Sequence, residues 1–281
     1  MLKVHKTGFY TSLQDRGRYH YRHFGVPLSG ALDQTALKRA NALLENGPDA
    51  AALEITMQGP ELEFTEHTFM VLSGATLEAH LSTEEEPLEM NQVYPVPEGA
   101  VLRCGHVLEG FRTYLSVKGG FLTEEILGSR SQYYPVTPQG AIKKGGVLPY
   151  EPCDAFSPKL LKISSPGYFK EEALKVFPGP DFGLLTGAQL EQVFEMDFTL
   201  SKEYDRMACQ ISPAITGISA NVITSATLPG TVQLTPAGTL IILMRDGQTT
   251  GGYPRILQLD TRSLDLMGQK KFGDRIRFRR A

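Results

Sequence analysis

The chain has 281 residues, with 28 Lys and Arg against 31 Asp and Glu, a formal net charge of −3 at pH 7 and 41% hydrophobic residues. These values are typical of a folded globular protein with one large domain or two smaller ones. The near balance of charge gives no electrostatic reason to expect a nucleic-acid partner, and no apolar run is long enough to span a membrane.

The N-terminal segment and the cysteines indicate a cellular compartment. The first residues, MLKVHKTGFY, lack the apolar stretch of a signal peptide. Cys104, Cys153 and Cys209 form no CxxC motif, and an odd number argues against a disulfide framework. The close pair His20 and His23 has no second cluster to complete a metal site. We therefore expect a cytoplasmic protein without a bound metal.

Two helices are predicted from their end signals. The first begins after Asp33, where apolar residues recur with a helical period over 36–44, and Asn46-Gly47 supplies a left-handed stop. The second begins at Thr186, which forms a capping-box pattern with Gln189, and runs to about Met196.

Most of the remaining pattern predicts strands. Short apolar runs bounded by Gly or Pro include FMVLSGA, YLSVKGGF, TVQLT, TLIILM, RILQL and RIRF. ALEIT at 52–56 is interpreted as a strand with alternate residues inward, which makes Glu54 structural. RIRF at 275–278 is interpreted as an edge strand with one solvated basic face. The predicted class is mostly β with a few short helices.

A Pro-rich and Ser-rich stretch indicates a division of the chain. Between Leu148 and Lys175 lie Pro149, Pro152, Pro158 and Pro166. The segment predicts two lobes, an N-terminal β-rich lobe at 1–160 and a C-terminal barrel lobe at 161–281. A long surface connection is the alternative.

Two N-terminal clusters are richer in polar groups than a fold alone requires. In Gln14-Asp15-Arg16-Gly17-Arg18, two guanidinium groups beside a carboxylate and an amide can clamp a carboxylate or phosphate; a solvated turn is the alternative. In FGVPLSGALD at 24–33, Gly30 follows Ser29 and allows a ligand to approach a helix N-terminus. The alternative there is a helix-entry loop that Asp33 caps.

Two C-terminal clusters have the same character. Tyr204-Asp205-Arg206-Met207 is a weak signal that is more typical of a surface ion pair. The segment 246–254, DGQTTGGYP, follows an apolar strand, and its adjacent glycines can expose backbone amides to an anionic oxygen. A hairpin turn is the alternative, but a turn does not require Gln-Thr-Thr and Tyr together, so we favour a binding role.

Several familiar signatures are missing, among them GxxxxGK[ST], GxGxxG, HExxH and GxSxG. Their absence excludes a stand-alone nucleotide hydrolase of the P-loop type. Other modes of nucleotide binding stay open.

The polar clusters, in this order, resemble the biotin-dependent carboxyltransferase-like family, which includes the C-type subunit of 5-oxoprolinase, allophanate hydrolase subunit 2, Kip-type antagonists and a segment of urea carboxylase. The resemblance runs from end to end. The matching stretches are SLQDRGR, FGVPLSGALD, ALEITMQGPELEF, YLSVKGGF, ILGSRS, FPGP, EYDRM, LPGTVQLTPAG and GQTTGGYP. Two departures stand out: Gly247 replaces a frequent histidine, and Ala208 replaces a glycine.

The resemblance implies a two-lobed, cyclophilin-like β-barrel architecture and an ATP-dependent 5-oxoprolinase that acts only with a B-type (Kip inhibitor-like) partner and an A-type partner. ATP with Mg²⁺ would be the co-substrate, because phosphorylation of the lactam oxygen of 5-oxo-L-proline creates a leaving group for hydrolysis to L-glutamate. A Kip-type protein that sequesters a kinase inhibitor, and a carboxyltransferase component acting on urea or a similar amide, are the alternatives.

The matching motifs also supply the candidate site residues. The candidate catalytic carboxylates are Asp15 and Asp205. The candidate residues for binding substrate or ATP are Gln14, Arg16, Arg18, Ser29, Gly30, Arg130, Arg206, Gln248, Thr249, Thr250, Gly251, Gly252 and Tyr253.

Overall fold

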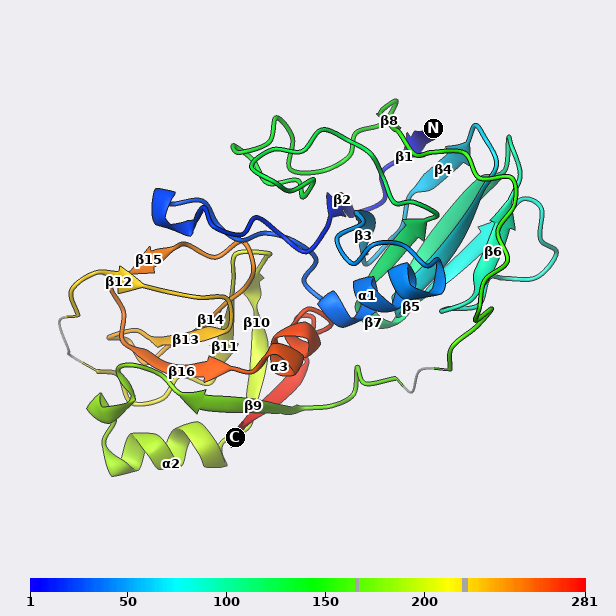
Figure 1. The fold of residues 1–281 in the computed structure, drawn as a ribbon. Coiled ribbons are helices and arrows are strands. Elements are labelled where there is room, and N and C mark those ends of the chain that lie inside the picture. Colours follow the sequence, from blue (N-terminus) through cyan, green and yellow to red (C-terminus); the bar gives the residue numbers. More distant parts are fainter. Residues whose placement is uncertain (165–166, 219–221) are drawn as a thin grey trace. The chain divides into compact units, whose positions relative to one another are not determined.

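The computed structural model describes residues 1–164, 167–218 and 222–281. Pro166, which belongs to the predicted linker, lies outside the described residues. The chain forms two compact units: unit 1 comprises Met1–Arg18 and Ser29–Phe169, and unit 2 comprises Tyr19–Leu28 and Lys170–Ala281. Unit 1 thus continues beyond residue 160, and a short N-terminal segment belongs to unit 2 (Figure 1).

Unit 1 consists of one sheet and one helix. Its elements are β1 (Leu2–Lys6), β2 (Tyr10–Gln14), α1 (Gln34–Leu43), β3 (Ala52–Thr56), β4 (Glu61–Phe64), β5 (Thr68–Leu81), β6 (Val93–Val96), β7 (Val101–Val117) and β8 (Val147–Leu148). The strand order is β2-β3-β7-β4-β1-β8, and β5 pairs with both β6 and β7. The long antiparallel pair of β5 and β7 shifts register between Gly74 and Ala79. The core of this unit is formed by apolar side chains such as Leu53, Leu72 and Leu115.

Helix α1 confirms the predicted start and corrects the predicted stop. Asp33 Oδ1 accepts a hydrogen bond from Ala36 N at 2.9 Å, as an N-cap does. The helix ends at Leu43, and the left-handed residue after it is Glu45 with φ 50°, not Asn46-Gly47. Asn46 instead donates its side-chain amide to Val117 O at 2.8 Å, which ties the helix end to β7.

Unit 2 contains a closed barrel. Its elements are η1 (Arg22–Phe24), β9 (Ala173–Pro178), η2 (Phe182–Leu184), α2 (Gly187–Glu195), β10 (Phe198–Tyr204), β11 (Ala208–Ser212), β12 (Ser225–Ala226), β13 (Thr231–Leu234), β14 (Leu240–Leu243), β15 (Thr250–Gly251), β16 (Arg255–Leu259), α3 (Thr261–Met267) and β17 (Arg275–Arg280). The barrel closes in the order β10-β11-β14-β13-β16-β9-β17, while β12 and β15 form a separate two-stranded ladder. The predicted mostly β, two-lobed class is confirmed.

Closure of the barrel overturns one prediction and leaves another in place. Strand β17 is not an edge strand, because it pairs antiparallel with β10 and parallel with β9. Its alternation does hold, since Ile276 and Phe278 are buried while Arg275 and Arg279 are exposed. The capping box of α2 is also confirmed, with Thr186 and Gln189 bonded reciprocally.

Helices of the described residues are short or amphipathic. None of them is both long enough and apolar enough to cross a membrane.

Candidate functional site

The Asp15 carboxylate lies buried at the end of β2 and is fully engaged by the protein. Its Oδ1 accepts hydrogen bonds from Gly17 N at 2.8 Å, Ser129 Oγ at 2.7 Å and Ser131 Oγ at 2.6 Å. Its Oδ2 accepts one from Arg130 N at 2.6 Å. These four donors join two loops that are far apart in the sequence. A carboxylate engaged in this way is well suited to hold the loops in position.

The neighbouring arginines also contact protein groups. Arg18 is fully buried and donates Nε to Ile126 O at 3.0 Å and its Nη2 to Ser131 O. Arg16 is partly exposed and pairs with Asp49 at 3.1 Å. Of the two, only Arg16 therefore presents part of its guanidinium to solvent.

Gln14 and Arg130 flank the Asp15 carboxylate in different ways. Gln14 is buried and donates Nε2 to Ser12 Oγ at 2.9 Å, while its Oε1 has no hydrogen-bond partner among the described residues. Arg130 pairs with Glu125 at 3.1 Å and lines a cavity of about 330 Å³ that also contacts Lys143. This small cavity is the concave surface that borders the Asp15 loops within unit 1.

Ser29 and Gly30 have unusual backbone conformations. Gly30 has φ +87°, and a Cβ there would come within 2.8 Å of the Arg16 carbonyl oxygen. The close approach that requires glycine is therefore made by the protein's own backbone. Ser29 has φ 56° and is fully buried, and its Oγ has no hydrogen-bond partner in the described ranges. A non-glycine residue in this region costs about 1–3 kcal/mol and is typical of functional loops.

Glu54 supports the same loop from β3. Both faces of β3 are covered, so all five of its residues are buried and the expected alternation is absent. Glu54 Oε2 accepts hydrogen bonds from Leu32 N at 2.8 Å and from the Tyr114 hydroxyl at 2.7 Å. Burial, reinforced by the charges of Glu54 and Asp33, raises the pKa of Tyr114 well above its usual value, so this hydroxyl stays a donor.

In unit 2, the partner of Arg206 is not its sequence neighbour. Arg206 forms a bidentate, buried ion pair with Asp246, with Nε–Oδ2 at 2.8 Å and Nη2–Oδ1 at 3.3 Å. Asp205 is exposed, and its Oδ1 accepts from Met207 N at 2.7 Å and Ala208 N at 3.0 Å. Asp205 thus closes the turn between β10 and β11, and the expected surface pair of adjacent residues is wrong.

The segment 247–254 is partly a strand. Thr250 and Gly251 form β15 and pair with Ala226 and Ser225 of β12. Gly251 and Gly252 are not among the residues with positive φ. A Cβ at Gly251 would lie 2.6 Å from Gln233 Nε2, so a side-chain amide crowds this glycine.

Residues Gln248, Gln233 and Arg22 complete this region of unit 2. Gln248 Nε2 donates to Gln233 Oε1 at 3.4 Å, and Arg22 Nη2 donates to Thr227 O at 2.6 Å. Thr249 O accepts from Thr227 N at 3.0 Å, while Tyr253 is 43% exposed. Sequence analysis missed Arg22 and Gln233. The only signal for Arg22 was its place in YHYRHF, directly before a matching motif.

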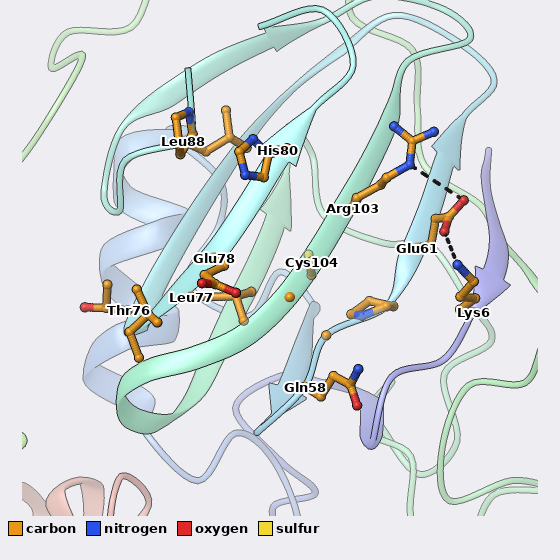
Figure 2. A pocket seen from close by; sticks show the side chains of 15 residues that line it. Lys6, Gln58, Glu61, Thr76, Leu77, Glu78, His80, Leu88, Arg103 and Cys104 are labelled. Carbon is orange, nitrogen blue, oxygen red and sulfur yellow. Dashed lines mark hydrogen bonds and ion pairs between the residues drawn. The ribbon is translucent and has the colours of Figure 1, made fainter. Parts of the chain in front are cut away.

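A cavity of about 750 Å³ lies in unit 1 on β4, β5 and β7 and contacts none of the predicted site residues. Figure 2 shows Glu61 there between Lys6 and Arg103, at 2.7 and 3.9 Å. Burial raises the pKa of Cys104 in this cavity to about 12, which makes the thiol a poor nucleophile. Within the described ranges, no group of three or more His, Cys, Asp or Glu is arranged to hold a metal ion.

Comparisons with known proteins place these clusters in a family. The family model described as "Carboxyltransferase domain, subdomain A and B" matches residues 24–280. Among curated proteins, the C-type subunit of 5-oxoprolinase from Escherichia coli K12 is 31% identical over 99% of this chain and 90% of its own length.

Solved structures give the same result. The crystal structure of TTHA0988 matches with a TM-score of 0.89 and 29% identity over 99% of this chain, which spans only 56% of that protein. The K. lactis urea amidolyase matches with a TM-score of 0.87 and 27% identity, and this chain corresponds to 18% of it. The same fold therefore occurs both in separate chains and inside larger enzymes.

Proposed function

The chain belongs to the carboxyltransferase domain family of subdomains A and B, and on that premise we propose that it is one subunit of an ATP-dependent 5-oxoprolinase. The observation that carries the proposal is the 31% identity to the C-type subunit of a 5-oxoprolinase over nearly the whole of both chains. In the proposed reaction, the γ-phosphoryl group of ATP moves to the lactam oxygen and leaves ADP. Attack of water on the same carbon then opens the ring, giving L-glutamate and phosphate.

The contacts of the site residues suggest how the work is divided. Asp15 accepts four hydrogen bonds in the protein, so we assign it a positioning role rather than proton transfer. Asp205 closes a turn and receives the same assignment. Ser29 Oγ and Gln248 Oε1 are buried without a partner in the described chain, and they are the better candidates for contacts with a ligand. Mg²⁺ would be held largely by the phosphates of ATP.

Within this proposal the chain acts with partners in the cytoplasm. We propose one B-type and one A-type partner protein, because the relative in E. coli is itself named as a subunit. The test is co-expression with both partners, followed by measurement of ADP and L-glutamate with and without 5-oxo-L-proline. We expect turnover only in the complex and only with 5-oxo-L-proline. Full activity of the isolated chain, or ATP hydrolysis indifferent to 5-oxo-L-proline, would contradict the proposal.

A second function is favoured by a specific observation. The structural match to K. lactis urea amidolyase, with a TM-score of 0.87, is consistent with a carboxyltransferase component that acts on urea or a similar amide. A carboxylated biotin carrier and urea, assayed for transfer of the carboxyl group, distinguish this function from the first. A stable complex with the B-type partner but no turnover of either substrate would favour the Kip-type regulatory alternative.

A further inference from the structure

Two buried polar atoms of unit 2 lack partners in the described chain and are anchored to the same residue. They are Arg22 Nη1 and Gln248 Oε1. Arg22 donates its other terminal nitrogen to Thr227 O at 2.6 Å, and Thr227 Oγ1 donates to Gln248 O at 2.5 Å. In Figure 1, the N-terminal segment that contains η1 runs beside β12 and β15. The two unused atoms therefore belong to side chains whose positions are fixed through one threonine.

The orientation of the Gln248 amide is set by a chain of hydrogen bonds. Gln233 is almost fully buried on barrel strand β13 and donates Nε2 to Tyr253 O at 3.4 Å. Its Oε1 therefore faces Gln248 and accepts from Gln248 Nε2 at 3.4 Å. The reversed amide would set two carbonyl oxygens against each other. Gln248 Oε1 is thus held as an acceptor, and an unsatisfied buried acceptor costs about 1–3 kcal/mol until a donor arrives.

Arg22 differs from the other largely buried arginines of its unit. Three of those are paired with carboxylates: Arg206 with Asp246, Arg245 with Asp265 and Arg255 with Asp181. No carboxylate of the described residues pairs with Arg22, although burial lowers its pKa by disfavouring the charged form. A guanidinium stays charged at neutral pH, so Arg22 retains an N–H donor suited to an anionic oxygen.

From these observations we propose that Arg22 and Gln248 recognise a small carboxylic acid that carries an amide N–H next to its carboxylate. The carboxylate accepts from Arg22 Nη1, and the N–H donates to Gln248 Oε1. The inference rests on the proposed function and deepens it, because 5-oxo-L-proline has this pair of groups on one carbon. Urea has the N–H but no carboxylate.

Binding of analogues tests the two contacts separately. The full chain, with its partners, is titrated by calorimetry with 5-oxo-L-proline, N-methyl-5-oxoproline and 2-pyrrolidinone. The second ligand lacks the N–H, and the third lacks the carboxylate. We expect each analogue to bind at least ten-fold more weakly than 5-oxo-L-proline. Equal affinity for all three would overturn the assignment.

Variants assign the contacts to residues. Arg22→Gln and Gln248→Leu should each weaken 5-oxo-L-proline at least ten-fold, and Arg22→Gln should lose its effect with 2-pyrrolidinone. Arg255→Gln is the matched control, since Arg255 also donates to a carbonyl of this segment, Ala226 O at 2.7 Å, but already pairs with Asp181. Wild-type binding by folded Arg22→Gln and Gln248→Leu, or equal loss in Arg255→Gln, would overturn the inference.

The outcome is separable from that of the proposed function. If the wild-type complex hydrolyses 5-oxo-L-proline and the KM of both variants is unchanged, the function stands and this inference is wrong. If the complex does not hydrolyse it but binding still depends on the carboxylate, the N–H, Arg22 and Gln248, the recognition site stands and the reaction is a different one.

Discussion

The Asp15 cluster of unit 1 and the Gln248 cluster of unit 2 have similar sequence signatures and opposite hydrogen-bond balances. Both combine amides, hydroxyls, arginine and glycine in a short stretch. The Asp15 carboxylate accepts hydrogen bonds from four donors of its own unit. By contrast, the Gln248 Oε1 and the nearby Arg22 Nη1 are buried and have no partner in the described residues.

The difference teaches that density of polar residues does not by itself mark a binding site. A charged group whose donors are all supplied by the protein stabilises the loops that supply them. A buried group without a partner costs free energy in the free protein, and a ligand can return it. The four predictions below test whether the two clusters divide in this way.

The largest effect is expected for Asp15→Asn. The new amide would turn N–H groups toward backbone and hydroxyl donors, leaving buried donors unsatisfied at about 1–3 kcal/mol each. We expect a loss of about 3 kcal/mol or more in the free energy of unfolding of unit 1, measured by urea denaturation. The matched control is Asp205→Asn, whose exposed side chain accepts only from Met207 N and Ala208 N. Equal, small losses in both variants would show that the Asp15 cluster is not structural.

The next effect concerns Gly30. Gly30→Ala adds a Cβ within 2.8 Å of the Arg16 carbonyl oxygen, at φ +87°. Strain of this kind costs about 1–3 kcal/mol, so we expect a loss of about 2 kcal/mol or more in the free energy of unfolding. Gly99 is the control, because it has φ +79° with nothing within 4 Å of an added Cβ. If Gly99→Ala costs as much, the backbone contact at Gly30 contributes nothing beyond the positive φ.

Local signals in the sequence predicted what depends on local contacts. The caps at Asp33 and Thr186 located the starts of α1 and α2, because a cap bonds to a backbone group only three residues away. The short apolar runs located β13, β14 and β16 for a similar reason. Barrel closure was not predictable, since the partners of β17 are set by tertiary packing rather than by its own alternation.

The site shows the same limit. Arg206 was expected to pair with its neighbour, but it bonds to Asp246, 40 residues away. Glu54 was expected to be structural, yet its partners Leu32 and Tyr114 could not be named from a strand pattern. The role of Arg22 depends on Tyr19–Leu28 belonging to unit 2. No periodicity in the sequence carries that information.

A smaller effect on stability, with a larger one on binding, is expected for Gly251. Neither Gly251 nor Gly252 is among the positive-φ residues, so alanine brings no backbone strain at either position. At Gly251, however, the added Cβ would lie 2.6 Å from Gln233 Nε2 and would displace the amide that orients Gln248. We expect Gly251→Ala to lower the free energy of unfolding by about 1 kcal/mol.

The binding measurement for this pair follows from the same geometry. Gly251→Ala should weaken 5-oxo-L-proline at least five-fold in calorimetry. Gly252→Ala is the matched control, because its Cβ would meet only Val222 O at 3.9 Å, and it should bind like the wild type. Unchanged affinity in Gly251→Ala would detach Gln233 from recognition and return segment 247–254 to a purely structural role.

The smallest effect separates Arg255, which has a carboxylate partner, from Arg22, which has none. Burial by itself would raise the pKa of Asp181, but hydrogen bonds from the Arg255 backbone N–H and guanidinium outweigh it and leave the pKa below its usual value. A carboxylate with a lowered folded pKa stabilises the protein above its unfolded pKa, and this contribution is lost as the pH falls through the folded value. We therefore expect wild type to exceed Asp181→Asn by up to about 1 kcal/mol in the free energy of unfolding at pH 7. The difference should shrink below about pH 5 and vanish once Asp181 is protonated in both states, because a neutral carboxyl resembles the amide. Urea denaturation of both proteins from pH 7 down to acid measures it. A difference that stays constant over that range would mean that Asp181 stabilises unit 2 by its shape and hydrogen bonds alone, and that Arg255 differs from Arg22 in something other than its neutralising partner.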